Sequence, residues 1–285
     1  MDDSDYAATV TDARDISLPD GRIVRVHDSG PSRSDRLTVL WHHGSPQTGA
    51  LLEPVLNACL ERRIRLLSYG RPSYGGSTPN PGRAVDAAAK DVESILDALE
   101  LDRIATMGAS GGGPHALACA ALLPERIRSV VTLAGIAPFT DEPSWYEGMA
   151  APGGLRAAAD GRAARADFAE TDEFDPSSFI PADYALLDGP WASLGEDANR
   201  ASADGDDGLI DDDVAFTRPW GFDLSAIACP VLLIQGGADR VVPAGHVERL
   251  QRALPFAETW SRPDDGHISV LAALPDALDW MLATS

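Results

Sequence analysis

Short apolar runs alternate with segments of helical periodicity, and this alternation constrains the fold more than any other feature of the sequence. The runs cover residues 37–41, 64–69, 103–107, 129–134 and 231–235. Each is the length of one strand and apolar on both faces, as in a parallel sheet covered by helices. Between two of them, Val85, Ala89, Val92 and Leu96 recur at helical spacing. We therefore predict an α/β protein, with a mostly parallel twisted sheet and helices on both faces.

The alternation stops between residues 137 and 222, where no apolar strand is recognisable. Residues 139–222 hold 19 acids and 5 arginines, so they carry −14 of the chain's net charge of −21. Because an irregular loop of this length is uncommon inside a compact domain, we predict a mostly helical insertion at 137–222. The core domain is then formed by residues 1–136 and 223–285. The acid-rich stretch 196–213 approaches low complexity and is predicted to be mobile.

Composition and charge exclude several classes of partner. A net charge of −21 argues against binding to nucleic acid or to an anionic membrane. The bases are almost all arginine, with Lys90 as the single lysine, which fits either codon bias or adaptation to high salt. No apolar stretch reaches the ~18 residues of a membrane span, and the acidic start at residues 1–5 is unlike a secretory signal. Three cysteines without a C-x-x-C pair fit a reducing compartment, so we expect a cytoplasmic protein of undetermined oligomeric state.

The segment from Gly108 to Gly112 reads G-A-S-G-G and lies between a predicted strand and a predicted helix. A G-x-S-x-G motif at this junction places Ser110 on a sharp turn with an exposed hydroxyl. Glycine is expected at positions 108 and 112 because the strand and helix backbones approach closely there. The turn also directs backbone N–H groups of the following helix at the group that the serine attacks. The motif predicts a nucleophilic serine.

The G-x-S-x-G motif and three further motifs give the sequence a resemblance to the cap-bearing serine hydrolases of the α/β-hydrolase superfamily. This resemblance extends over nearly the whole chain. The sequence from His43 to Pro46 (HGSP) follows a strand and is similar to the family's oxyanion-loop motif. Asp239 directly follows an apolar strand, where the family has its acid, and His267 lies near the end of the chain, where the family has its base. The order of serine, aspartate and histidine matches the family.

The resemblance implies a catalytic triad of Ser110, Asp239 and His267. The imidazole of His267 would take the proton of the serine hydroxyl, and Asp239 would orient and stabilise the imidazolium. The backbone N–H groups of Gly111 and Ser45 would form the oxyanion hole. The family's chemistry requires no cofactor and no metal, and none of the histidines shows the spacing of metal ligands.

In relatives, an insertion at this place forms a cap over the serine. Aromatic residues of the insertion, with His43 of the oxyanion loop, are therefore candidates for the substrate pocket, namely Trp145, Tyr146 and Trp191. Asp239 could alternatively cap a helix, and Asp264 or Asp265 could orient His267 instead. Of the other histidines, His115 is expected to be structural, and His27 and His246 to face solvent.

The leading hypothesis is a serine hydrolase that cleaves carboxylic esters of small molecules through an acyl-enzyme. A proline-iminopeptidase-like aminopeptidase acting on amides is the alternative, since acids near the mouth would attract a protonated amine. Ser45, Gln47 and Gly111 depart from the H-G-G-P-G and G-x-S-W-G patterns of that family. A carbon–carbon bond hydrolase or lyase, and a non-catalytic ligand receptor on the same fold, remain further alternatives. A serine at position 110 argues against dehalogenases and epoxide hydrolases, which use an aspartate nucleophile.

Overall fold

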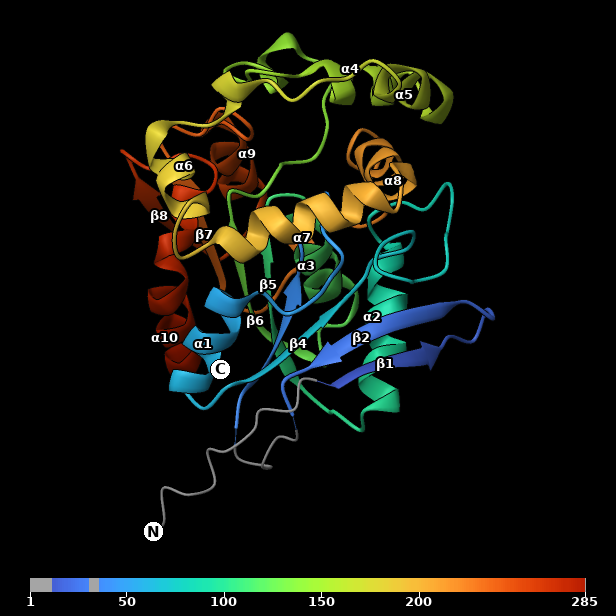
Figure 1. The fold of residues 1–285 in the computed structure, drawn as a ribbon. Helices are drawn as coiled ribbons and strands as arrows, with labels where there is room; N and C mark the ends of the chain where they lie inside the picture. The colour runs from blue at the N-terminus through green and yellow to red at the C-terminus, as the bar shows by residue number, and fades with distance from the viewer. Residues whose placement is uncertain (1–11, 31–35, 285) are drawn as a thin grey trace.

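An eight-stranded sheet in the order β1-β2-β4-β3-β5-β6-β7-β8 runs through the protein (Figure 1). The computed structural model describes residues 12–30 and 36–284, so the acidic start at residues 1–5 lies outside the described residues. The strands are β1 (Asp12–Ser17), β2 (Ile23–Asp28), β3 (Thr38–His42), β4 (Arg65–Tyr69), β5 (Ile104–Ala109), β6 (Ile127–Leu133), β7 (Val231–Gly236) and β8 (Ala257–Arg262). β1 and β2 form an antiparallel hairpin, β2 pairs antiparallel with β4, and the strands from β4 to β8 in the sheet order are parallel. The predicted mostly parallel sheet is confirmed.

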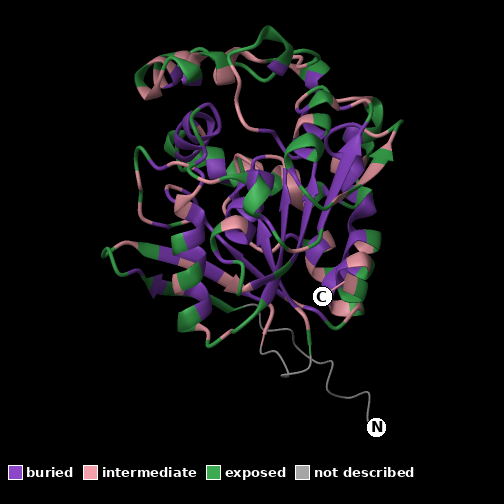
Figure 2. Ribbon diagram, turned by 180° about the vertical axis from the view of Figure 1, so that it is seen from behind, coloured by how far each residue is buried: buried purple, intermediate pink, exposed green. Residues whose placement is uncertain are grey.

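Helices cover both faces of this sheet. One face packs against α2 (Ala87–Ala98), α3 (Gly112–Leu122) and α9 (Gly245–Ala253), the other against α1 (Glu53–Glu61) and α10 (Leu274–Thr284). On β3, Leu40 joins the first of these two cores, whereas Val39 and Trp41 join the second. All five residues of β3 are buried, as are most of the central strands in Figure 2. A strand covered on both sides needs apolar residues at every position, which explains the continuous runs.

The edge strand β8 was not predicted. Its sequence AETWSR contains half-buried and exposed residues, none fully buried, and has no apolar run. It pairs with β7 on one side only, so its burial, and with it the sequence signal, is weaker than in the central strands. The 3-10 turn η5 (Ser269–Ala273) directly precedes α10, and Pro275 is the second residue of that helix.

Residues 137–222, here called the inserted segment, lie between β6 and β7 and contain helices but no strand. The elements are η2 (Pro143–Trp145), α4 (Gly153–Ala159), α5 (Arg162–Ala169), η3 (Pro176–Ser178), α6 (Pro181–Leu187), α7 (Ala192–Ala203) and α8 (Asp207–Phe216), and η4 (Leu224–Ala226) follows. In Figure 1, α4 and α5 lie farthest from the sheet. The stretch 196–213, predicted to be mobile, instead forms most of α7 and α8. It is held there by buried aspartates such as Asp197 and Asp212, which bond to the core.

Among the helices of residues 12–30 and 36–284, none is both long and apolar enough to cross a membrane. The cytoplasmic location remains a prediction.

Candidate active site

Ser110 sits on the turn between β5 and α3. Its φ angle of 52° lies in the left-handed region, which costs a non-glycine residue about 1–3 kcal/mol. The Ser110 N–H donates to the carbonyl of Leu133 at 2.8 Å and fixes the turn to β6. A Cβ on Gly108 would overlap the backbone of Gly112, and one on Gly112 would overlap the backbone of His42. The predicted reason for the two glycines is confirmed.

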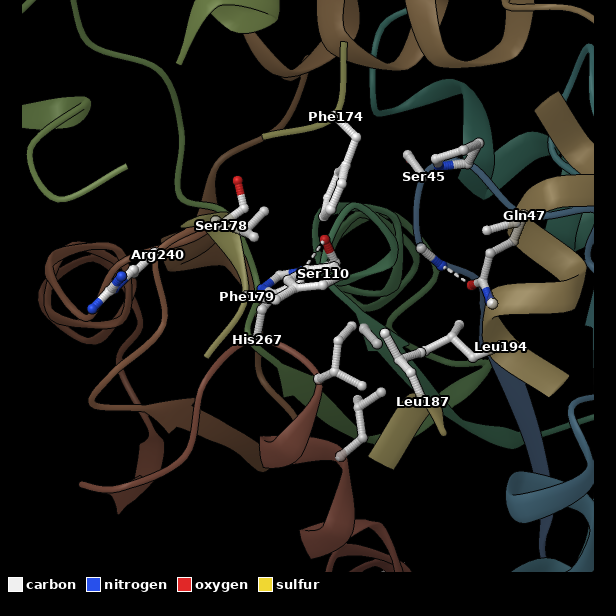
Figure 3. A pocket seen from close by; sticks show the side chains of 18 of the residues that line it. Ser45, Gln47, Ser110, Phe174, Ser178, Phe179, Leu187, Leu194, Arg240 and His267 are labelled. Atoms are coloured by element: carbon white, nitrogen blue, oxygen red, sulfur yellow. Dashed lines mark hydrogen bonds between the residues drawn. The ribbon is translucent and has the colours of Figure 1, made fainter. Parts of the chain in front are cut away.

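Three side chains from separate loops form one hydrogen-bonded chain. Nε2 of His267 lies 3.0 Å from Oγ of Ser110, and Nδ1 lies 2.8 Å from Oδ2 of Asp239. Figure 3 shows Ser110 and His267 directed toward one another. Asp239 follows β7, and its Oδ1 accepts from the N–H groups of Val241 and Val242 at 2.8 and 2.9 Å. Asp239 therefore orders the turn after β7 with one oxygen and contacts the imidazole with the other.

The competing acids lie elsewhere. Asp265 pairs with Arg262, whose Nε is 2.7 Å from its carboxylate, and within the described residues neither Asp264 nor Asp265 bonds to His267. Asp239 does not cap α9, because that helix begins after Ala244. Of the candidate acids, only Asp239 reaches the imidazole.

Opposing effects act on the imidazole of His267. Its burial lowers the pKa, but the negative charge and hydrogen bond of Asp239, together with the charge of Asp183, outweigh burial and raise the pKa above its usual value. With Nδ1–H donating to Asp239, Nε2 of the neutral ring can accept the proton of the Ser110 hydroxyl. The arrangement fits a general base next to a nucleophile.

Backbone amides of two loops meet beside Ser110. Gly111 precedes the first turn of α3, and a Cβ placed on it would lie 2.6 Å from Oγ of Ser45. The amide N–H groups of Gly111 and Ser45 have no hydrogen-bond partner in the described part of the chain. The loop of Ser45 is closed by the bond from Gly44 N to Oε1 of Gln47 at 2.5 Å and contains a cis peptide before Pro46. Two free donors therefore lie next to the serine.

A cavity of about 520 Å³ opens onto Ser110 and His267. Most of its walls are apolar, with Trp41, Leu187, Leu194 and Leu271 among the lining residues. The inserted segment supplies a large share of the lining, including Phe174 and Phe179, whose rings are 5.2 Å apart. Its lining residues, all within the described part of the chain, include no aspartate or glutamate, and Arg240 is the one arginine. Arg240 and Leu194 lie on opposite sides of Ser110 in Figure 3.

The sequence from residue 38 to residue 273 matches the family model described as the alpha/beta hydrolase fold. The chain belongs to the α/β-hydrolase family. This match spans the sheet, the serine turn and the loops of Asp239 and His267.

Individual α/β hydrolases resemble the chain at low identity. It is 28% identical to a putative carbamate hydrolase RutD of Caulobacter, over 91% of this chain and 93% of the relative. It is 25% identical to a putative non-heme chloroperoxidase of Synechocystis, over 84% of each chain. Among solved structures, a bromoperoxidase of Bacillus anthracis has a TM-score of 0.73 at 22% identity, covering 95% of this chain and all (100%) of that one. An esterase of Thermogutta terrifontis has a TM-score of 0.70 at 21% identity, covering 95% and 98%. The family and these relatives make the protein a hydrolase, and the solved structures share its fold.

A buried ionic cluster of this α/β hydrolase lies behind the Ser45 loop. Asp212 of α8 bonds to Arg71 at 2.6 Å and lies 2.8 Å from Arg83, and it accepts from the hydroxyl groups of Ser45 at 2.5 Å and Tyr74 at 3.1 Å. Burial raises the pKa of Asp212, but the two arginines overcome this and hold the pKa well below its usual value. The carboxylate is therefore charged. Sequence reasoning missed Asp212, because no local pattern distinguishes it from exposed acids of the same stretch such as Asp206 and Asp207.

His43 does not line the cavity, contrary to the prediction. Its Nδ1 lies 2.6 Å from the carbonyl of Gly44, and its Nε2 accepts from the N–H of Arg71 at 3.1 Å. Burial, and the nearby charge of Arg71, lower its pKa well below the usual value, so the ring is neutral. His43 holds the oxyanion loop against the next loop rather than facing a substrate.

The aromatic candidates of the inserted segment also lie outside the cavity lining. Trp145 is buried, its Nε1 donates to the carbonyl of Pro138 at 3.0 Å, and its ring packs edge-on against Tyr146 at 4.9 Å. Tyr146 is covered by the guanidinium of Arg156, 4.2 Å from its ring centre. Trp191 begins α7 and packs into the core that includes α1 and α10. These three rings fasten the inserted segment to the sheet domain and do not line the cavity.

His246, expected to face solvent, is buried on α9. Its Nδ1 accepts from the N–H of Ala137, where the inserted segment begins, at 3.1 Å. Burial lowers its pKa to about 4. His115 is structural as expected, since its Nδ1 lies 2.8 Å from the carbonyl of Gly111.

Proposed function

We propose that this α/β hydrolase cleaves carboxylic esters of small, mostly apolar molecules through an acyl-enzyme on Ser110. The observation that carries the proposal is the continuous chain from Asp239 through His267 to Ser110, open to the apolar cavity. Such a chain activates a serine hydroxyl, which is a weak nucleophile by itself.

In the first half of the reaction, the Ser110 oxygen attacks the ester carbonyl while His267 takes the hydroxyl proton. The carbonyl oxygen becomes negative and is received by the N–H groups of Gly111 and Ser45. Loss of one such donor typically lowers turnover by ~10²–10³. His267 then gives its proton to the departing alcohol, and the acyl group remains on Ser110. In the second half, water loses a proton to His267, attacks the acyl group and restores the serine.

The cavity favours an ester over the substrate of an aminopeptidase. A protonated amine next to the scissile bond requires carboxylates, and the described lining residues include none. Arg240, the cation of the lining, would repel an amine. Two buried acids of the inserted segment, Asp212 and Asp213, do not supply the missing charge, since both are paired with arginines. The acidic insertion therefore gives the aminopeptidase hypothesis little support.

Active-site labelling and a substrate panel test this proposal. A fluorophosphonate should label the intact protein and should fail to label Ser110→Ala. Short p-nitrophenyl esters should be cleaved much faster than prolyl-naphthylamide. Absence of labelling in the intact protein would favour a ligand receptor, and faster cleavage of the amide would favour the aminopeptidase.

A further inference from the structure

A buried carboxylate of the inserted segment binds the loop that carries His267. Asp183, on α6, is 0% exposed. Its Oδ1 accepts three hydrogen bonds, from the N–H of Ile268 at 2.9 Å, the N–H of Ser269 at 2.7 Å and the hydroxyl of Ser269 at 2.8 Å. Its Oδ2 accepts from the N–H of Ile180 at 3.0 Å, which fixes Asp183 to the start of its own helix.

The backbone on the other side of His267 is connected to the same carboxylate. The N–H of Gly266 donates to Oγ of Ser269 at 2.6 Å, and that hydroxyl donates to Asp183. Gly266 also packs so closely on Asp183 that a Cβ at this position would overlap the carboxylate. Residues before and after His267 are therefore tied to one side chain that lies 84 positions earlier in the sequence.

Asp183 also acts on His267 through its charge. The charged groups that raise the pKa of His267 are two carboxylates, Asp239 after β7 and Asp183 of α6. Asp239 makes a direct hydrogen bond, whereas Asp183 contributes through space. On adjacent loops, Arg240 lines the cavity, and Arg262 is neutralised by Asp265.

We propose that Asp183 is a positioning residue, which holds the imidazole of His267 at hydrogen-bond distance from Ser110 and makes this placement depend on the inserted segment. The inference rests on the proposed function for the role of His267 as general base. A misplacement of ~1 Å can cost about 10²-fold in rate, so releasing the loop that carries the base should impair turnover more than substrate binding.

The test compares Asp183→Asn with Asp197→Asn. Asp197 is a matched control, because it is another buried carboxylate of the inserted segment and accepts from the N–H and hydroxyl of Thr48 at 3.0 and 2.6 Å, away from His267. Both variants should lose stability in urea. Asp183→Asn should in addition lower kcat by about 10–100-fold with little change in KM. It should also move the acidic limb of kcat/KM to lower pH, because a charge that raises the pKa of His267 is gone. Asp197→Asn should leave that limb in place.

A purely structural role predicts a different pattern. If Asp183→Asn loses stability like Asp197→Asn but keeps the wild-type kcat and acidic limb, the proposal is wrong. If Asp183→Asn does not fold, Ser269→Ala replaces it, since this variant removes the hydroxyl bridge between Gly266 and Asp183. Its kcat should then fall without a matching rise in KM, and an unchanged kcat would contradict the proposal.

A separate readout distinguishes this inference from the proposed function. The pKa of His267 can be measured by NMR titration of labelled histidine, with His267→Gln used to assign the signal. If the wild type cleaves no ester, the proposed function fails, whereas a lower pKa of His267 in Asp183→Asn still supports the placement of Asp183. An unchanged pKa would overturn it.

Discussion

The hydroxyl of Ser45 donates a 2.5 Å hydrogen bond to Asp212, so the loop beside the serine is held by a side chain of the inserted segment. The same hydroxyl accepts from Nη2 of Arg71 at 2.8 Å. Ser45 is thus fixed from α8 on one side and from the loop after β4 on the other. The amide N–H of Ser45 is a proposed oxyanion donor, so the contact with Asp212 makes the position of this donor depend on the inserted segment.

Replacing Asp212 by asparagine should strongly destabilise the protein. Arg71 and Arg83 would remain buried without a counter-charge, and breaking a buried ion pair in this way costs about 3–5 kcal/mol. Urea unfolding of Asp212→Asn measures the loss. Ser45→Ala, which keeps all three charges, should cost only about 1 kcal/mol. Equal stability of Asp212→Asn and the wild type would contradict the assigned ion pairs.

Replacing Asp239 by asparagine should preserve the fold and abolish most turnover. The amide can present its N–H₂ group to Nδ1, which stabilises the wrong tautomer of His267, and the equivalent change in a serine protease costs about 10⁴-fold in kcat. Ester hydrolysis under saturating substrate measures the loss. Asp265→Asn is the control and should keep turnover within about ten-fold, because Asp265 pairs with Arg262. Near-normal turnover of Asp239→Asn would show that another group orients the base.

Filling the part of the cavity next to Leu194 should narrow the range of ester chain lengths that the protein accepts. Leu194 lines the cavity on α7, and a Leu194→Trp change should exclude long acyl chains while leaving room for acetate. Each methylene that no longer fits forfeits about 0.8 kcal/mol of binding, so exclusion of two or three of the four extra methylenes of hexanoate should lower its kcat/KM about 10–100-fold relative to acetate. Leu122→Trp, at an exposed position of α3, is the control and should leave the ratio unchanged. A parallel loss for both esters in Leu194→Trp would mean that the chain does not enter this part of the cavity.

The acidic limb of kcat/KM should lie above pH ~6.5, the usual pKa of histidine. His267 must be neutral to accept a proton, and in the folded protein its pKa is raised, so activity is lost as the pH falls through that raised value. A pH–rate profile with an uncharged ester measures the limb. A limb well below pH ~6.5 would contradict the dominance of the carboxylates over burial.

The free energy of unfolding should fall as the pH drops below ~6.5. Burial lowers the pKa of five histidines, which are the deeply buried His42, His43, His115 and His246 and the half-buried His27. In the unfolded chain these histidines take up protons as the pH falls through ~6.5, whereas in the folded protein they stay neutral. The free energy of unfolding therefore decreases on the acid side of pH ~6.5. Two carboxylates act in the opposite direction, because burial raises the pKa of Asp213 to about 6 and also raises the pKa of Asp91. The pKa of His267 is raised as well, so its effect on stability lies above pH ~6.5.

A difference of about two to three protons between the unfolded and folded chain near pH ~5 corresponds to a loss of roughly 3–4 kcal/mol per pH unit. Urea unfolding at pH ~7 and pH ~5 checks this slope. His246→Gln should make the slope shallower by about 1.4 kcal/mol per pH unit, since one of the imidazoles held neutral is removed. Equal stability at both pH values would mean that the histidines are not held neutral.

Ser110 was predictable because it sits in a local pattern, whereas Asp239 and His267 were assigned through the resemblance to a family with its acid after a strand and its base near the chain end. Ser110 and Asp239 directly follow apolar runs, and such runs identify buried strands whose ends meet at one edge of the sheet. The glycines at 108 and 112 add a steric requirement that few other turns share. These signals lie within a few residues of Ser110 and Asp239, whereas His267 was found only through the resemblance.

The cavity and its supports were not predictable in the same way. Aromatic residues such as Trp145 were expected in the pocket, but a large ring is as well suited to joining two parts of the fold, and nothing in the local sequence separates the two uses. Asp183 and Asp212 gain their roles from partners 86 and 141 residues away. In a segment rich in acids, such distant pairing leaves no local pattern.

The contacts of Asp183 and Asp212 mean that the inserted segment is not an exchangeable module. A chimaera carrying the corresponding segment of another hydrolase would lose the carboxylate behind the histidine loop and the one behind the Ser45 loop at the same time. Transplantation aimed at a new substrate range would then also disturb the reaction itself, unless both aspartates were carried over.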